Sequence, residues 1–205
     1  MGLYAQYVLP RLINLAMQGK TAEADRARLI PMASGKVLEI GIGSGLNLPF
    51  YNREVEQLDG LDPSLELWQL ARSRAARAPF PVEFIRSSAE RIPAGDETFD
   101  TVVTTWTLCS IPDPAQALRE MKRVLRPGGR FLFIEHGRSP DPGVFAWQNR
   151  LNPLWRRLAG GCNLNRGIDA LIRDAGFAIT WIETGYSDGP PLFTYRFRGV
   201  AGTSA

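Results

Sequence analysis

The sequence contains only two cysteines, one histidine and three lysines in 205 residues. Cys109 and Cys162 do not indicate a disulfide framework, and the chain shows no signal-peptide pattern, so we expect a reducing cytoplasm. No apolar run reaches the ~18 residues that a membrane-spanning helix needs, so no membrane span is expected. Two isolated cysteines and one histidine, His136, do not constitute a zinc site, and no metal is expected.

Long blocks of one charge are also lacking. The 24 basic residues, mostly arginines, are scattered among 21 acidic ones and give a net charge of +3. A nucleic-acid interface would gather these arginines into a patch or run, so no nucleic-acid partner is expected. The length suits one domain, 1–205, with an extension beyond a minimal α/β unit.

A glycine-rich turn follows a short apolar run in residues 37–45, V-L-E-I-G-I-G-S-G. The run suits a strand buried on both faces, and glycines at alternate positions mark a turn where the backbone approaches a ligand closely. Dinucleotide dehydrogenases use G-x-G-x-x-G, but Leu46 stands where the third glycine belongs. The spacing G-x-G-x-G favours S-adenosylmethionine, and a plain turn is the alternative.

An acidic residue follows the next apolar run. Asp62 comes directly after residues 55–61, at the carboxyl end of the expected neighbouring strand. A carboxylate there is placed to accept hydrogen bonds from both ribose hydroxyls of a nucleotide. The alternative is that Asp62 is an ordinary N-cap acid. Ser64 is also expected to be the N-cap, or to lie next to it. After the third run, Ser88 and Ala89 could present polar groups to an adenine edge.

The alternation of apolar runs and helical patterns predicts a parallel sheet covered by helices. Strands are expected over 37–40, 55–61, 81–86, 99–105, 130–135, 177–183 and 192–198. Helices are expected within 1–30, in the crossover from 45, and over 64–77, 114–125, 144–158 and 168–175, with a kink at Pro153. The buried stripe expected for 64–77 comprises Leu65, Leu67, Trp68, Leu70 and Ala71.

Five motifs in order resemble the class I S-adenosylmethionine-dependent methyltransferases. They are V-L-E-I-G-I-G-S-G, G-L-D-P-S, S-A-E-R-I-P, F-D-T-V-V-T-T-W-T-L-C-S-I and L-R-E-M-K-R-V-L-R-P-G-G-R-F-L-F-I-E-H. The resemblance implies a Rossmann-like three-layer α/β sandwich with a seven-stranded sheet, in which only the last strand is antiparallel. It divides the chain into a helical cap (1–30), a cofactor-binding core (36–136) and acceptor-side helices and last strands (137–205).

The same resemblance implies the site. Glycines of the turn would line the methionine part of S-adenosylmethionine, Asp62 the ribose, Ser88 and Ala89 the adenine, and Thr105 the methyl-donor end. Ser88 replaces the usual acidic residue at the adenine position. The full expected cofactor-binding set is Glu39, Gly41, Gly43, Ser44, Gly45, Asn47, Asp62, Pro63, Ser64, Ser88, Ala89, Glu90, Thr105 and Trp106.

Segments after the fourth and fifth strands, with the N-P-L-W and G-C-N-L-N-R segments of residues 152–166, resemble the alkyl-thiol S-methyltransferase group. His136 would serve as a base or substrate contact, or as a structural histidine. We interpret Cys109 as packing near the acceptor, and Cys162 as part of its wall. The expected substrate set is Tyr4, Tyr7, Cys109, His136, Trp147 and Asn163.

The predicted function is therefore methyl transfer to a small, apolar acceptor, with a thiol preferred. A thiol with a pKa near ~8.5 is already partly thiolate at neutral pH, so it asks little of a base. The alternatives are a quinone-ring carbon or a phospholipid amine as acceptor, and a catalytically silent module that only binds S-adenosylmethionine. A nicotinamide oxidoreductase is disfavoured by Leu46.

Overall fold

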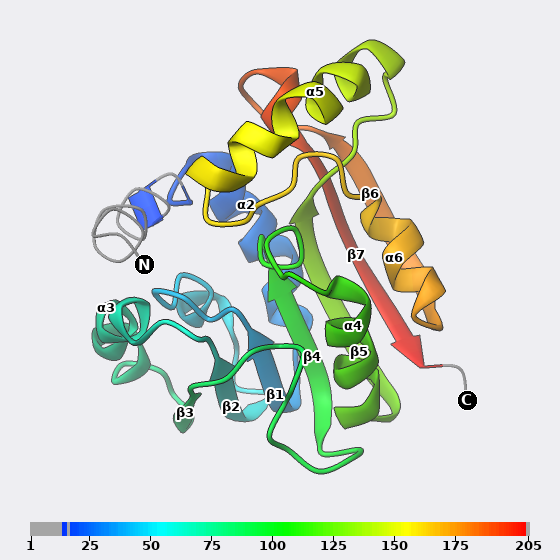
Figure 1. The fold of residues 1–205 in the computed structure, drawn as a ribbon. Helices are drawn as coiled ribbons and strands as arrows, with labels where there is room; N and C mark the ends of the chain where they lie inside the picture. Colours follow the sequence, from blue (N-terminus) through cyan, green and yellow to red (C-terminus); the bar gives the residue numbers. More distant parts are fainter. Residues whose placement is uncertain (1–13, 16, 204–205) are drawn as a thin grey trace.

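One seven-stranded sheet organises the chain (Figure 1). The computed structural model describes residues 14, 15 and 17–203. The strands are β1 (Gly35–Ile40), β2 (Val55–Leu61), β3 (Val82–Ile85), β4 (Phe99–Thr105), β5 (Leu125–His136), β6 (Phe177–Tyr186) and β7 (Tyr195–Thr203). Their order is β3-β2-β1-β4-β5-β7-β6, and β7 runs antiparallel to both β5 and β6. The predicted sheet, with only its last strand antiparallel, is confirmed.

Helices cover both faces of the sheet and give three layers. The helices are α2 (Lys20–Leu29), α3 (Leu65–Ala75), α4 (Pro114–Val124), α5 (Pro142–Leu158), α6 (Ile168–Asp174) and α7 (Pro191–Thr194), with the 3₁₀ turns η2 (Ile30–Met32) and η3 (Leu48–Phe50). Helices α4 and α6 pack on one face, and α2, η2 and α3 on the other. Figure 1 shows α5 beyond the carboxyl end of β5.

Neighbouring residues of the central strands point into opposite cores. In β1, Val37 packs toward α2 while Leu38 packs toward α4. In β5, Leu132 lies in the same core as Val37, and Phe131 in the same core as Leu38. Both faces are therefore dry, and the strands have no polar face. This double burial is why they read as continuous apolar runs in the sequence.

The first crossover differs from the prediction. Instead of a helix after Gly45, the chain makes only the turn η3, and Tyr51 then becomes extended. Pro49 lies at the start of η3, where its missing N–H costs nothing. Tyr51 donates its hydroxyl to the buried Glu39 carboxylate at 2.8 Å. We infer that this bond holds the crossover against the sheet in place of a helix.

Two further predictions are wrong in detail. The segment from Leu192 begins as the helical turn α7, so β7 starts only at Tyr195, while β6 continues to Tyr186. In α3, Leu65 and Leu70 are 39% and 41% exposed, and Ala71 is the buried residue of the expected stripe. Helix α3 packs beside the edge strand β3, where Trp68 stacks on Phe84, and less of its surface is covered there. Its N-cap is Ser64, as predicted, accepting from the Leu67 amide.

Helix α2 is the described part of the predicted cap, and a buried ion pair fixes it to the sheet. Asp25 is 2% exposed and accepts hydrogen bonds from Arg196 and, at 2.5 Å, from Arg198 of β7. Arg198 is itself 2% exposed. Within the residues that the structure describes, no helix combines the length and apolar character needed to cross a membrane.

Replacing Asp25 by Asn is expected to destabilise the fold strongly, because two guanidinium groups would lose their buried counter-charge. The expected loss is about 3 kcal/mol in the free energy of unfolding, measured by urea denaturation. Asp169→Asn is the control, since Asp169 forms an exposed i,i+4 pair with Arg173 and should cost at most about 0.5 kcal/mol. Equal losses in the two variants would contradict the anchoring role of Asp25.

Candidate active site

A first cavity of about 620 Å³ lies at the carboxyl ends of β1, β2 and β4. All but one of the residues expected to bind the cofactor line it: Glu39, Gly41, Gly43, Ser44, Asn47, Asp62, Pro63, Ser64, Ser88, Ala89, Glu90, Thr105 and Trp106. The exception is Gly45. The remaining wall includes Asn14, Met17 and Arg26, which precede the sheet in the chain. This is the sheet edge at which open α/β folds bind ligands.

The three glycines of the turn have different reasons to be glycine. All have positive φ angles: +73° at Gly41, +52° at Gly43 and +73° at Gly45. A Cβ on Gly41 would lie 2.3 Å from Thr107 Oγ1, and one on Gly45 would lie 2.8 Å from Leu48 Cδ1. At Gly43 the nearest atom would be 3.8 Å away, the Gly41 carbonyl oxygen. Only Gly43 therefore leaves free space beside the backbone, and it borders the cavity.

Asp62 ties this turn to α3. Its Oδ2 accepts from the Gly43 amide at 3.0 Å, and its Oδ1 accepts from the Ser64 amide at 2.8 Å. Burial raises the pKa of Asp62, and these two backbone bonds oppose the rise. An ionised carboxylate has about four acceptor sites, so each oxygen keeps one for a ligand hydroxyl.

A buried polar network closes the floor of the cavity. Glu39 is 1% exposed and accepts from Asn47 Nδ2 at 2.9 Å and Tyr51 Oη at 2.8 Å. Asn47 also accepts from Arg26 Nε at 2.9 Å and donates to Thr105 Oγ1 at 3.0 Å. Burial raises the pKa of Glu39 to about 7, against the two hydrogen bonds and the charge of Arg26.

Arg26 is a buried charged residue of this site that the sequence did not predict. It lies in α2, is 4% exposed, and donates Nη1 to the Met17 carbonyl at 2.7 Å. Burial lowers its pKa to about 10, opposed by Glu39. Its guanidinium carbon lies 4.7 Å from the ring centroid of Trp106. Arginines are frequent in this chain and α2 is polar overall, so no sequence signal distinguished this one.

Trp106 has φ +49°, a left-handed conformation that is uncommon for a bulky residue. Its amide donates to the Ile134 carbonyl at 2.7 Å, which holds the turn against β5. Strained backbone persists where the surrounding structure enforces it, often at functional sites. Trp106 lines the first cavity and also a second one, so this turn places the indole between them.

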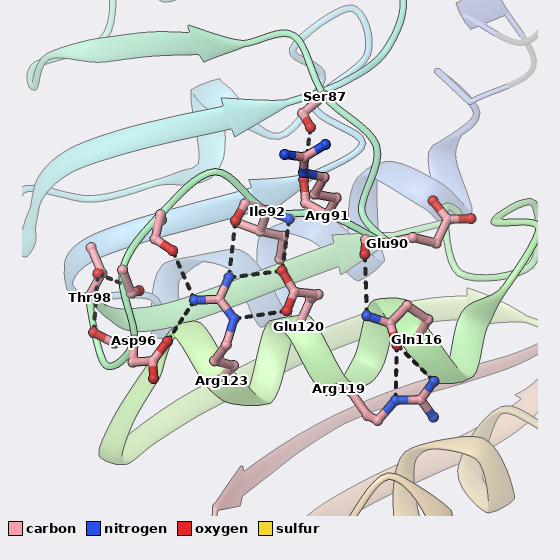
Figure 2. A network of polar contacts seen from close by, with 12 residues as sticks. Ser87, Glu90, Arg91, Ile92, Asp96, Thr98, Gln116, Arg119, Glu120 and Arg123 are labelled. Carbon is pink, nitrogen blue, oxygen red and sulfur yellow. Dashed lines mark hydrogen bonds and ion pairs between the residues drawn. The ribbon is translucent and has the colours of Figure 1, made fainter.

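The wall formed by residues 88–90 is fixed from behind by α4. Figure 2 shows the Arg123 guanidinium held by Glu120 and reaching across to the loop that follows β3. Arg123 donates to the Ile92 and Ala94 carbonyls at 3.0 and 2.9 Å, while Glu120 accepts from the Ile92 amide at 3.0 Å. Gln116 also donates to the Glu90 carbonyl. The loop is thus tied to a rigid helix.

The second cavity, about 750 Å³, lies between α2, α5, α7 and the ends of β4 and β5. Its apolar lining includes Met17, Trp106, Trp155, Leu158, Leu164 and Phe193. Both cavities are lined by Met17, Trp106, Ser110 and Ala159. The two cavities are therefore adjacent and share a wall.

The second cavity contains both cysteines and the histidine. Cys162 Sγ lies 3.7 Å from Cys109 Sγ and 3.7 Å from His136 Nε2. The pKa of Cys162 is lowered, mainly by the contact with Cys109 and then by the contact with His136. The pKa of Cys109 is raised by the contact with Cys162 and by burial. Burial lowers the pKa of His136, but Cys162 and Glu135 outweigh it and the net shift is upward. The interpretation of the cysteines as isolated is wrong, because the fold brings them together.

Other expected substrate residues lie elsewhere. Tyr4 and Tyr7 are outside the described residues. Trp147 is 55% exposed on α5, beside Arg150, and lines neither cavity, so its assignment to the acceptor pocket is not supported. Asn163 also lines neither cavity; its Nδ2 donates to the Cys109 carbonyl at 3.0 Å. Asn163 positions the cysteines, while the base role of His136 stays a prediction.

Comparison with known proteins agrees with this geometry. The family described as a methyltransferase domain matches residues 38–133. Human thiol S-methyltransferase TMT1B is 34% identical over 196 residues, which cover 92% of this chain and 79% of the relative. The chain belongs to the S-adenosylmethionine-dependent methyltransferase family. Its cofactor is accordingly S-adenosylmethionine.

This methyltransferase also resembles a phosphatidylethanolamine N-methyltransferase of Cereibacter sphaeroides, at 37% identity over 58% of the chain and 60% of the relative. The chain thus spans less than two thirds of that protein. The solved structure of YcgJ from Bacillus subtilis has a TM-score of 0.67 at 18% identity, covering 96% of this chain and 99% of that one. That likeness supports the fold alone.

Removing the Arg123 side chain is expected to weaken cofactor binding without direct contact, because the loop carrying residues 88–90 loses its ties. For Arg123→Ala we expect a loss of about 1 kcal/mol, or about fivefold, in affinity for S-adenosylhomocysteine, measured by calorimetry. Lys122→Ala is the matched control on the same helix, since Lys122 donates to the Gly176 carbonyl, away from this loop. Unchanged affinity in Arg123→Ala would exclude a positioning role.

The contribution of Glu39 to the stability of the free enzyme is expected to fall as pH rises from about 4.5 to 7. In this window the folded Glu39 keeps a proton that the unfolded chain has lost, because its pKa is raised to about 7. The difference between the pKa values of Glu39 in the folded and unfolded states corresponds to at most about 3 kcal/mol in the free energy of unfolding. Glu135, whose pKa burial also raises to about 7, adds to the slope. Glu39→Gln should reduce the pH dependence of urea unfolding; an unchanged slope would contradict this ionisation.

Proposed function

We propose that this methyltransferase transfers the methyl group of S-adenosylmethionine to a small, apolar thiol. The observation that carries the proposal is the shared wall of the two cavities at Trp106 and Ser110. The first cavity has the features of a nucleoside site. The second has a mostly apolar lining with thiol and imidazole groups, and its charged lining residues are Lys20, Asp25, Asp188 and Arg196. Adjacent sites let two bound reactants meet without solvent between them.

The first cavity fits S-adenosylmethionine in two respects. Each oxygen of Asp62 retains an acceptor site for a ribose hydroxyl, and the free space at Gly43 admits a close approach to the backbone. Ser88 and Ala89 would face the adenine, while Glu39 and its partner Asn47 would hold the methionine end. When bound, this cofactor supplies a methyl group on a sulfonium, which is already activated for transfer.

The protein's own task is then to bind, orient and dry the acceptor. The lining of Trp155, Leu158 and Phe193 suits an apolar body, and a bound acceptor of that kind would displace water from the reacting atoms. A thiol is partly ionised near neutral pH, so it places the smallest demand on a base. The name of the relative TMT1B, a thiol S-methyltransferase, supports the same acceptor class.

We further propose that the helical cap (1–30), the core (36–136) and the acceptor side (137–205) act as one domain. In support, α2 contributes Arg26 to the first cavity and Asp25 to the second. We place the reaction in the cytoplasm, since Cys109 and Cys162 are free thiols only 3.7 Å apart and would be kept reduced there.

The test is release of S-adenosylhomocysteine from purified enzyme given S-adenosylmethionine and a panel of alkyl thiols, phenols, quinols and lipid amines. We expect release with thiols, and we expect mass spectrometry to detect the corresponding methyl thioether. Asp62→Ala should weaken S-adenosylmethionine binding several-fold or more, while Asp174→Ala, an exposed acid on α6, should not. Release only with an amine or quinol would overturn the acceptor class. If the enzyme binds the cofactor but no compound of the panel causes release, a silent binding module would be favoured.

A further inference from the structure

Three side chains from distant parts of the sequence meet at one end of the second cavity. Cys109 follows β4, His136 ends β5, and Cys162 follows α5. Their ligand atoms all lie within 4.8 Å of one another. Each of the three residues lines the cavity, so the group is accessible from that side.

Two of the three spacings match a tetrahedral metal site, and the third, between Cys109 Sγ and the His136 ring, is within 4.8 Å. With zinc–sulfur bonds of about 2.3 Å and a zinc–nitrogen bond of about 2.05 Å, two sulfurs lie about 3.8 Å apart, and a sulfur and a nitrogen about 3.6 Å apart. The distances from Cys162 Sγ are 3.7 Å to Cys109 Sγ and 3.7 Å to His136 Nε2. A disulfide would need a sulfur–sulfur distance of about 2.05 Å.

Backbone hydrogen bonds hold the three segments in place. The buried carboxylate of Glu135 accepts from the amides of Thr107 at 3.2 Å and Cys109 at 3.4 Å. The backbone amide of Asn163 donates to the Cys109 carbonyl at 2.9 Å, and its side chain donates to the same oxygen. The cysteines are thus fixed next to each other by groups that are not themselves ligands, as second-shell partners do in metal sites.

We propose that Cys109, Cys162 and His136 bind a zinc ion whose fourth position opens into the second cavity and takes the sulfur of the acceptor. Two thiolates and an imidazole favour a soft or borderline ion, and a set of two cysteines and one histidine with an open position is a catalytic zinc arrangement. The metal site goes beyond the proposed function. The role of the fourth coordination position, which takes the acceptor thiol, rests on that proposed function.

The chemistry at the open position is a ligand exchange. The acceptor thiol displaces a water molecule, forms a zinc–sulfur bond and releases its proton to solvent. The metal lowers the pKa of a coordinated thiol, so the acceptor is held as thiolate, the nucleophilic form. An amine or phenol lacks the soft sulfur that this ligand set selects.

The first experiment is the metal content of the untagged enzyme, purified without chelator in a zinc-supplemented preparation. We expect about one zinc per chain, and on exchange with cobalt(II) a visible spectrum of tetrahedral cobalt with sulfur-to-cobalt charge transfer. Because these are the chain's only cysteines and histidine, the spectrum assigns the ligands directly. Cys162→Ser should weaken zinc binding more than about 100-fold, since loss of even an outer-shell partner costs about 10–100-fold.

Asp188→Asn is the matched control, because Asp188 lines the same cavity and is not one of the three ligands. Circular dichroism and S-adenosylhomocysteine binding check that each variant folds. The proposal is overturned if the enzyme holds no stoichiometric metal, if the two cysteines are found as a disulfide, or if the cobalt spectrum survives Cys162→Ser.

A thiol titration separates this inference from the proposed function. An alkyl thiol should shift the charge-transfer band of the cobalt enzyme, whereas the corresponding methyl thioether should not. Metal binding with neither a thiol shift nor thiol methylation would reject the thiol acceptor and leave the metal site standing. Full thiol methylation by metal-free enzyme would reject the role of zinc and leave the proposed function standing.

Discussion

The structure depends on one buried carboxylate at the end of the central strand β1. A carboxyl group that is 1% exposed needs hydrogen-bond partners, and Glu39 finds them in Asn47 and Tyr51. These partners lie in the crossover that lacks a helix, so the carboxylate determines where this segment runs. Through Asn47 the same network reaches Arg26, and thereby α2. One polar group at the strand end thus shapes the floor of the first cavity.

Helix α2 connects this network to the other half of the molecule. Two consecutive residues point to different partners: Asp25 to the arginines of β7, and Arg26 to Asn47 and Trp106. Each residue lines a different cavity. An ion pair in which both side chains are buried is costly to break. Helix α2 therefore fixes the positions of the two cavities relative to each other. The turn at Trp106, strained in its backbone, is the part of the wall that both cavities share.

The sheet and most of the first cavity could be predicted from the sequence, since each rests on local patterns. Strands buried on both faces are continuous apolar runs, and a glycine turn or Asp62 is recognisable from its distance to a strand. Arg26 could not be predicted, because its importance comes from burial under a tertiary contact. The same holds for the helical turn at 191–194, where Pro191 overrides the apolar pattern of a strand. The exposure of Trp147 could not be predicted, because an aromatic residue on a helix does not reveal which side of the helix is covered.

The cysteines show why a residue count is a poor guide to which side chains the fold brings together. Counting residues along the chain made Cys109 and Cys162 isolated, yet parallel strands end at the same edge of a sheet, and loops after β4 and β5 must therefore meet there. Cys109 follows the end of β4 and His136 is the last residue of β5, so their proximity follows from topology. Only the position of Cys162 depends on a contact that the sequence does not predict. In that contact the neighbouring Asn163 donates a hydrogen bond to the Cys109 carbonyl. The proposed thiol methylation would gain from the proposed metal site, because zinc held by two thiolates selects sulfur over nitrogen and oxygen by bonding preference, whereas an apolar cavity selects only by shape.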